Sequence, residues 1–404
     1  MSTPAVKVKS QDAVEGERGA ALRQQMKAAP AALFQFPPEL RTGELSDRYF
    51  VRAMRTLALD GLDPLVTMQV FSKKTGIVAG IPEAIRMLQV GLAGGYGLDD
   101  IEVRTLLEGD HINVDTEWEP VMHIAGPYRA FAHLETPLLG VLARRSLVAT
   151  NTAAAVKAAG DKPLIFMAPR HDDWRVQCGD GYAALVGGAA AVSSDVGGQW
   201  AGVRAVGTMP HALIAAYGGD TVRATLAFAR YVKAEEPHVD VVSLVDYDND
   251  VIGTSLDVAR AMRTEFGAGT LTAVRVDTSE RLIDRALVND PEIFGRHKAT
   301  GVNPHLVRKL RAALDEAGFS EVGIIVSGGF TPKKIAAFEN GGVPVAGYGV
   351  GSSLLGHNDG TDGLKTGFDF TGDIVVVDGC REAKLGRRLL DSDRLVRVQW
   401  GGIA

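Results

Sequence analysis

The sequence contains very little cysteine, and this shortage limits the class of protein that it can encode. Only Cys178 and Cys380 are cysteines among the 404 residues. Two thiols are too few for the disulfide framework of a secreted domain or for a cysteine-rich zinc site. We therefore expect a protein of a reducing compartment, and the cytoplasm fits this expectation.

Long apolar runs and an excess of positive charge are absent as well. No run reaches the ~20 apolar residues that a membrane-spanning helix needs, and the first residues lack the apolar core of a signal peptide. The formal net charge of -6 offers no general attraction to nucleic acid or to an anionic membrane. We therefore expect small molecules as ligands, without nucleic-acid or membrane partners, and any bound phosphate must be held by local groups.

The sequence does contain an ordinary globular composition whose texture changes along the chain. Apolar residues make up 46% and charged residues 23%, and the length suits one large α/β domain with a smaller one. Residues 1–35 are polar, alanine-rich and without a sustained apolar face, which predicts a flexible extension. We expect residues 36–126 and 358–404 to form one discontinuous α+β domain, and residues 127–357 to form an α/β barrel.

The expected barrel rests on a repeated alternation of short apolar runs with helical patterns. The runs that read as buried strands are residues 164–167, 188–192, 203–206, 241–245, 273–276, 323–326 and 345–348. Seven strands, mostly followed by helices, favour an irregular TIM-like barrel, although a doubly wound sheet produces the same kind of run. A further helical stretch, residues 130–149, should be broken or kinked at Pro137.

The most distinctive stretch follows the third of these runs. Residues 207–214 read GTMPHALI, in which Gly207 ends the apolar run and Pro210 prevents further ladder pairing. His211 then stands beyond the carboxyl end of the expected strand, which is where parallel α/β folds bind ligands. Neutral imidazole can act there as a nucleophile or a proton carrier. Alternatively, a loop histidine can simply satisfy a backbone carbonyl.

Charged and polar side chains follow the other expected strands. They are Arg170 and His171, Ser193, Asp246 and Asp248, and Arg275 and Asp277. Carboxylates at such positions can hold ribose hydroxyls or a Mg²⁺ ion that bridges phosphates, and arginines can pair with phosphate or carboxylate. Helix capping by the aspartates, or ion pairs within the set, would explain the same residues without a ligand.

Two glycine-rich turns complete the pattern. Ser327-Gly328-Gly329 follows one expected strand, and Gly349-Val350-Gly351-Ser352 follows the next. Glycine lets the backbone approach an anion closely, while amides and hydroxyls bind its oxygens. Two such turns late in a barrel predict a phosphate site. Together with the charged residues they predict a phosphosugar whose other end is also charged, and phosphoribosyl pyrophosphate fits this description.

At these residues the chain resembles the nicotinate phosphoribosyltransferases, of the type II phosphoribosyltransferase fold, in their shorter archaeal-like form. The likeness runs from about residue 46 to residue 387, and 207–214 is its most specific part. The other matching motifs are residues 47–50, 135–139, 187–188, 274–278, 327–329, 349–352 and 383–387. Several motifs in the family's order are hard to obtain by chance.

The resemblance implies transfer of a phosphoribosyl group from phosphoribosyl pyrophosphate to nicotinate, which gives nicotinate mononucleotide and pyrophosphate in NAD biosynthesis. It implies that ATP phosphorylates His211 and so couples its hydrolysis to the transfer. Arg275 and Asp277 would hold the phosphoribosyl group, with the phosphate on Ser327, Gly328, Gly329, Gly349, Gly351 and Ser352. Mg²⁺ would accompany the pyrophosphate near Asp246 and Asp277.

The resemblance also implies how the base is bound. Tyr49 would stack on the pyridine ring from the neighbouring subunit of a homodimer with shared active sites. Arg170 would lie near the base and the pyrophosphate, and Ser193 would replace an aspartate of the nicotinamide enzymes. A serine can donate a hydrogen bond to a carboxylate, whereas an aspartate would repel it. Thr208, Asp246 and Asp248 are further substrate-binding candidates.

Three positions depart from the family's pattern. Met167 occupies a position that is usually aromatic, His171 replaces a second arginine, and Asp195 adds a negative charge two residues after Ser193. An alternative acceptor, another heteroaromatic acid of secondary metabolism, therefore stays open. A non-catalytic phosphosugar or nucleotide sensor on the same scaffold is the other alternative.

Overall fold

The chain, seen in a computed structural model, divides into two compact units. The first unit comprises the residues up to Thr150 together with those from Gly367 onward, and the second is Asn151–Thr366. The structure describes residues 11–29, 31–114, 117–288, 290–291, 293, 298–357, 360 and 362–400. Among these residues no helix is both long and apolar enough to cross a membrane.

The first unit is built on a six-stranded antiparallel sheet with the order β13-β12-β1-β5-β3-β14. The strands are β1 (Leu65–Phe71), β3 (Glu102–Thr105), β5 (Pro120–Pro127), β12 (Thr371–Val377), β13 (Cys380–Arg381) and β14 (Val396–Arg397). A small second sheet pairs β2 (Gly76–Ile77) with β4 (His111–Ile112). The strands after residue 366 thus return to the first unit, as their apolar runs predict.

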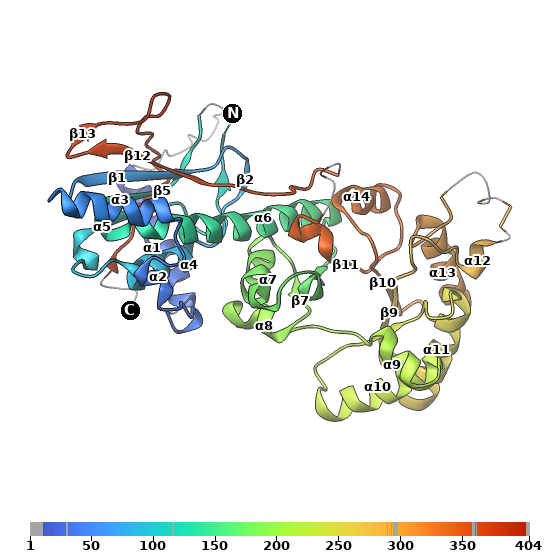
Figure 1. The fold of residues 1–404 in the computed structure, drawn as a ribbon. Coiled ribbons are helices and arrows are strands. Elements are labelled where there is room, and N and C mark those ends of the chain that lie inside the picture. Colours follow the sequence, from blue (N-terminus) through green and yellow to red (C-terminus); the bar gives the residue numbers. More distant parts are fainter. Residues whose placement is uncertain are drawn as a thin grey trace, which may run out of the picture. The chain divides into compact units, whose positions relative to one another are not determined.

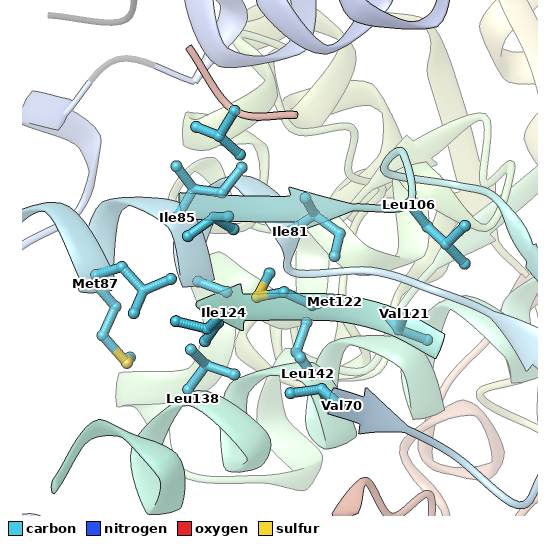
Figure 2. Packing of buried hydrophobic residues seen from close by; sticks show 14 of the residues in the cluster. Val70, Ile81, Ile85, Met87, Leu106, Val121, Met122, Ile124, Leu138 and Leu142 are labelled. Atoms are coloured by element: carbon cyan, nitrogen blue, oxygen red, sulfur yellow. The ribbon is translucent and has the colours of Figure 1, made fainter. Parts of the chain in front are cut away.

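The central strands of this sheet are buried along consecutive residues, and one face packs on an apolar core. Met68 and Val70 of β1 are almost fully buried, and they belong to a cluster that also contains Met122 and Ile124 of β5. Leu138 and Leu142 of α6 and Ile81 and Ile85 of α4 belong to the same cluster (Figure 2). The helices that enclose this core are α2 (Glu39–Thr42), α3 (Arg48–Leu59), α4 (Ile81–Gly91), α5 (Tyr128–Phe131) and α6 (Glu135–Ala159), with short 3₁₀ turns η1 (Ala31–Leu33), η2 (Leu98–Asp100) and η3 (Ala132–Leu134).

Two expectations for this unit change. Pro137 does not kink a helix, because α6 begins at Glu135 and the proline lies in its first turn, where its missing N–H has no intrahelical partner to lose. Residues 11–29 are not a free extension: α1 (Gln11–Ala28) is a helix, and Leu22 and Met26, one turn apart, are buried in the core. Residues 1–10 lie outside the described part of the chain.

The second unit contains a six-stranded parallel sheet with the order β7-β6-β11-β10-β9-β8. Figure 1 labels β7, β9, β10 and β11 of this sheet together with the helices of the unit. Its strands are β6 (Leu164–Phe166), β7 (Ala191–Val192), β8 (Val241–Leu244), β9 (Leu271–Val276), β10 (Gly323–Val326) and β11 (Gly347–Val350). Its helices are α7 (Gln177–Val186), α8 (Asp195–Gly198), α9 (His211–Ala216), α10 (Thr221–Glu235), α11 (Val251–Phe266), α12 (Arg285–Val288), α13 (Pro304–Glu316) and α14 (Pro332–Asn340), with 3₁₀ turns η4 (Pro169–His171), η5 (Trp174–Val176), η6 (Gln199–Ala201) and η7 (Ser352–Leu355).

One of the seven expected strands does not form. Residues 203–206 are extended but lack a ladder, although the Val206 N–H donates to the Val192 carbonyl at 2.8 Å. Val203 and Val206 are 41% and 38% exposed, so the run gains little from burial and Gly202 and Gly207 flank it. Within the described residues the sheet is therefore open, with β7 and β8 at its edges.

The buried carboxyl of Glu135 makes the stability of the first unit depend on pH. Burial, followed by the charges of Asp373 and Asp47, raises its pKa from 4.5 to about 8. Between these two pH values the folded protein holds a proton that the unfolded chain releases, so the stability linked to this group is complete below pH 4.5 and is lost as the pH rises to about 8. We expect Glu135→Gln to flatten this decline, measured by urea denaturation at several pH values, with the exposed Glu44→Gln as control. Equal pH slopes in wild type and Glu135→Gln would contradict the expectation.

Candidate active site

A cavity of about 1420 Å³ lies in the second unit, at the carboxyl ends of its parallel strands. Every residue that lines it belongs to this unit. Met167 and Arg170 follow β6, Arg275 and Asp277 lie at the end of β9, and the turns after β10 and β11 supply much of the remaining wall. The position follows from the parallel topology, which gathers the residues after each strand at one edge of the sheet.

Most of the predicted site residues meet in this cavity. Those among its lining residues are Arg170, Ser193, Thr208, His211, Arg275, Asp277, Ser327, Gly328, Gly329, Gly349, Gly351 and Ser352. Asp246 is not a lining residue but contacts His211, and Asp248 is exposed outside the lining. Tyr49 belongs to the first unit, where it is 61% exposed and its hydroxyl donates to Asp47 Oδ2 at 3.2 Å.

His211 is held by Asp246. It is the first residue of α9, and its Nε2 lies 3.1 Å from Oδ1 of Asp246, a side chain that is only 7% exposed. This hydrogen bond is the main cause that raises the pKa of His211. Because a carboxylate only accepts, Nε2 of the neutral ring carries the hydrogen and Nδ1 keeps its lone pair. His211 therefore has one nitrogen fixed by Asp246 and the other free to act as a nucleophile.

A small separate core fixes the segment before His211, although this segment is not a strand. Met209 is fully buried and packs with Ile214 of α9, Ala224 of α10 and Leu244 of β8. The hydroxyl of Thr225 contacts the Met209 sulfur at 3.4 Å. The buried Met209 side chain thus anchors the irregular backbone next to Pro210. Apart from the apolar character of methionine, no local sequence pattern predicts this anchor.

Arg275 and Asp277 form the charged floor of the site. Arg275 is largely buried, and its Nε has no hydrogen-bond partner among the described residues. Burial lowers its pKa, and the charges of Asp277 and Asp246 oppose this shift. Asp277 Oδ1 accepts a hydrogen bond of 2.8 Å from the Ser327 hydroxyl, so this carboxylate is oriented with its second oxygen available. A buried cation with an unpaired N–H is suited to an anionic ligand.

Helix capping falls on residues other than the site aspartates. Asp250 caps α11 by accepting from the Gly253 N–H at 3.1 Å, and Ser194 caps α8. Asp246 is left to bind His211. Asp195 is exposed and is not a lining residue, so its charge lies outside the wall that Ser193 contributes.

The two glycines of the first glycine turn, residues 327–329, lie close to two carboxylates. Gly328 and Gly329 have φ values of 83° and 64°. A Cβ on Gly328 would lie 3.0 Å from Asp277 Oδ1, and one on Gly329 would lie 2.5 Å from Glu280 Oε1. The positive φ values therefore favour glycine at both positions. The Ser327 amide donates to the Val276 carbonyl at 2.9 Å.

The second glycine turn, residues 349–352, is packed against the segment after β6. A Cβ on Gly349 would lie 2.7 Å from the Met167 sulfur, and one on Gly351 would lie 2.9 Å from His171 Cε1. Ser352 follows in the same wall of the cavity. Met167 thus lies between this turn and Arg275, whose Nη1 is 3.9 Å from its sulfur.

Several lining residues were not predicted from the sequence. They are Glu280, Lys298, Phe330, Thr331, Lys333, Lys334, His357 and Asp362 among others. Lys334 Nζ donates to the Gly328 carbonyl at 3.2 Å and lies 4.3 Å from the Phe330 ring centre, and burial lowers its pKa. One sequence signal could have identified Lys333 and Lys334. The first glycine turn leads directly into α14, whose first turn contains both lysines, and the N-terminus of a helix favours anions.

The arrangement suits a ligand with several negative groups. Arg170, Arg275 and three lysines line the cavity, against the carboxylates Asp277, Glu280 and Asp362. In the part of the chain that the structure describes, no group of three or more histidine, cysteine, aspartate or glutamate side chains could hold a metal ion.

Comparisons with known proteins give a consistent result. A family model described as "Quinolinate phosphoribosyl transferase, N-terminal domain" matches residues 47–146. The chain is 31% identical over 341 residues to the nicotinate phosphoribosyltransferase pncB1 of Mycobacterium tuberculosis, which covers 78% of this chain and 69% of that protein. It is 29% identical over 238 residues to the nicotinate phosphoribosyltransferase of Bacillus subtilis, covering 59% and 43% of the two chains.

Solved structures have the same fold. The nicotinate-nucleotide pyrophosphorylase of Pyrococcus furiosus superposes with a TM-score of 0.71 and 27% identity, covering 91% of this chain and 86% of that one. The human nicotinic acid phosphoribosyltransferase superposes with a TM-score of 0.61 and 19% identity, covering 85% and 77%. The second likeness concerns the fold alone.

Proposed function

The chain belongs to the nicotinate phosphoribosyltransferase family, and we propose that the cavity of its second unit is where it carries out the family's reaction. This enzyme reaction moves a phosphoribosyl group from phosphoribosyl pyrophosphate to nicotinate and gives nicotinate mononucleotide and pyrophosphate, in NAD biosynthesis. The observation that carries the site assignment is the meeting of Arg275, Asp277 and both glycine turns in one cavity.

The donor binds at the glycine turns. Its 5-phosphate is held by backbone amides and hydroxyls of residues 327–329 and 349–352, and the free oxygen of Asp277 accepts a hydrogen bond from a ribose hydroxyl. Arg275 faces the pyrophosphate. The nicotinate nitrogen forms a bond to C1 while the bond from C1 to the pyrophosphate oxygen breaks. Fixed charges stabilise the oxocarbenium-like transition state without a covalent enzyme intermediate on the sugar.

The base binds beside Arg170 and Ser193. Arg170 supplies positive charge for the nicotinate carboxylate, and the Ser193 hydroxyl donates to it. Thr208 lies in the same wall. Tyr49 of a second copy stacks on the ring, so the active protein is a homodimer with shared sites. The 61% exposure of Tyr49 leaves its ring available for such a contact.

ATP and Mg²⁺ act at the same site. His211 Nδ1, which Asp246 leaves free, attacks the γ-phosphorus of ATP; a N–P bond forms and ADP leaves, which couples ATP hydrolysis to the transfer. The absence of a three-ligand cluster among the described residues fits Mg²⁺, which is commonly held by substrate phosphates and one or two carboxylates, here Asp277 and Asp246. When bound, Mg²⁺ neutralises charge on the leaving pyrophosphate.

We propose that the second unit forms an irregular TIM-like barrel. Its sheet runs from β7 through β6, β11, β10 and β9 to β8, and residues 203–206 lie in the chain between β7 and β8. The hydrogen bond from the Val206 N–H to the Val192 carbonyl of β7 supports residues 203–206 as a distorted seventh segment of this barrel. The proposed discontinuous α+β domain takes the bounds of the first unit, up to Thr150 and from Gly367 onward, in place of the expected 36–126 and 358–404. Two cysteines suit a cytoplasmic location.

An assay with nicotinate, phosphoribosyl pyrophosphate and Mg²⁺, with and without ATP, tests this function. We expect nicotinate mononucleotide in both cases and more of it with ATP. His211→Ala is expected to abolish the ATP effect while leaving the Kd of nicotinate within about twofold, because the histidine handles phosphate and not the ring. His238→Ala, an exposed histidine outside the cavity, is the control. No mononucleotide under any condition would reject the function, and equal loss of nicotinate binding would reject the role of His211.

A different heteroaromatic acid is the second candidate acceptor. The observation that favours it is the pairing of Met167 with Arg275 and Gly349, which puts a flexible thioether where the family usually has an aromatic ring. Calorimetric titration with a panel of pyridine and azole carboxylic acids separates the two candidates. Nicotinate binding best by a wide margin would remove the second.

A further inference from the structure

His171 is packed directly on the second glycine turn. It ends the 3₁₀ turn η4 after β6, and it lines the cavity together with Gly351. A Cβ on Gly351 would lie 2.9 Å from Cε1 and 3.3 Å from Nδ1 of the histidine ring. The ring edge is therefore in contact with the backbone that the proposed function assigns to the 5-phosphate.

The ring carries an unpaired nitrogen. Nδ1 of His171 is buried and has no hydrogen-bond partner among the described residues. The charged or titratable groups that act on the ring are Arg170 on the same turn and His357 beyond the second glycine turn, and both are basic. Burial is the main cause that lowers the pKa of His171, those two groups add to it, and only the Ala168 carbonyl opposes it. The ring is thus neutral in the empty site near neutral pH.

We propose that His171 binds a proton when a phosphate group occupies the second glycine turn, so that the ring becomes a cation only in the occupied site. The inference rests on the proposed function, which places a phosphate there. No carboxylate of the described residues acts on the ring, so a dianion at this turn would bring negative charge beside it. An opposite charge within about 4–6 Å favours the charged form of a histidine. A second arginine at position 171, which the family's pattern has, would be charged whether or not phosphate is bound.

The linkage predicts a pH dependence of binding. Phosphate affinity should be highest where a proton is readily available and should fall as the pH rises between the pKa values of the free and occupied states. This linkage also requires Gly351, because any side chain at this position would displace the His171 ring from the second glycine turn.

The test uses the full chain and inorganic sulfate, which stays a dianion over the pH range and so excludes titration of the ligand itself. Sulfate affinity is measured by calorimetry from about pH 6 to pH 8, with two buffers of different ionisation enthalpy to count protons. We expect uptake of up to one proton per sulfate and an affinity about tenfold weaker at the upper pH in the wild type. The dependence should drop to about twofold or less in His171→Gln, and His171→Arg should bind tightly across the range.

Ring-proton NMR of the histidines gives a second readout that does not depend on stability or turnover. The His171 signals, assigned by their loss in His171→Gln, should titrate at higher pH when sulfate is present. His238→Gln, which changes an exposed histidine outside the cavity, is the matched control and should keep the proton uptake. Equal pH dependence in wild type and His171→Gln, or an unshifted His171 titration, would overturn the inference. Nicotinate mononucleotide formation would then still stand as a separate result, so the failure of this inference and the failure of the proposed function are distinguishable.

Discussion

Replacing Arg275 with methionine should lower kcat by about 10²–10³-fold, the usual range for removing one preorganised group that stabilises transition-state charge. Methionine preserves much of the buried apolar stem while it removes the guanidinium. That guanidinium is buried, has an unpartnered Nε and lies within the influence of Asp277 and Asp246. Without it, the departing pyrophosphate loses a fixed counter-charge in a site where water cannot replace it easily.

Steady-state rates at saturating nicotinate and varied phosphoribosyl pyrophosphate measure this effect. Arg281→Met is the matched control, because Arg281 is exposed and does not line the cavity. Thermal unfolding of both variants separates a loss of chemistry from a loss of fold. A fall in kcat of less than about threefold for Arg275→Met would mean that the charge stabilises the bound ground state and the transition state equally.

Replacing Gly181 with alanine should cost about 1–3 kcal/mol of stability, the usual range for overpacking. Gly181 is buried in α7, and its added Cβ would lie 2.3 Å from the Gly197 carbonyl oxygen and 2.5 Å from the Gly197 Cα in α8. These are backbone atoms, so they cannot swing aside as the end of a flexible side chain would. The two helices must separate or the variant must remain strained.

Urea denaturation measures this loss, and Gly207→Ala is the control because nothing lies within 4 Å of its added Cβ. Gly181→Ala should also raise the KM of nicotinate. Helix α8 begins directly after Ser193 and Ser194, so its displacement moves the wall of the cavity to which Ser193 belongs. If Gly181→Ala and Gly207→Ala unfolded at the same urea concentration, this result would contradict the backbone contact between α7 and α8.

The strands of the second unit were predictable because each is a short apolar run bounded by glycine, proline or charge. Residues 323–326 coincide with β10, and Asn303 and Thr331 cap α13 and α14. Residues 203–206 are apolar except for Arg204, but Val203 and Val206 stay exposed and the run does not form a strand. Local pattern records hydrophobicity, whereas strand formation also needs a partner ladder and a covering layer.

The candidate site divides in the same way. Arg275, Asp277 and the glycine turns were found because strand order alone brings the ends of parallel strands together. Lys334 and Asp362 were missed because they come from a helix and a later loop, whose approach to the cavity depends on tertiary packing. The bond from Nε2 of His211 to Asp246 likewise joins residues of different elements and has no local sequence signature.

The sheet order of the first unit has a consequence for how the chain matures. Strand β1 pairs on one side with β5, which follows soon after it, and on the other with β12, which follows only after the whole second unit. At ordinary rates of synthesis, roughly ten to fifty seconds separate the emergence of β5 from that of β12. During this interval the second unit is completed as one contiguous segment, while β1 presents an unpaired edge that invites wrong association. Wrong association of nascent chains is therefore expected along β1 during this interval, while the residues of the catalytic pocket have already been synthesised.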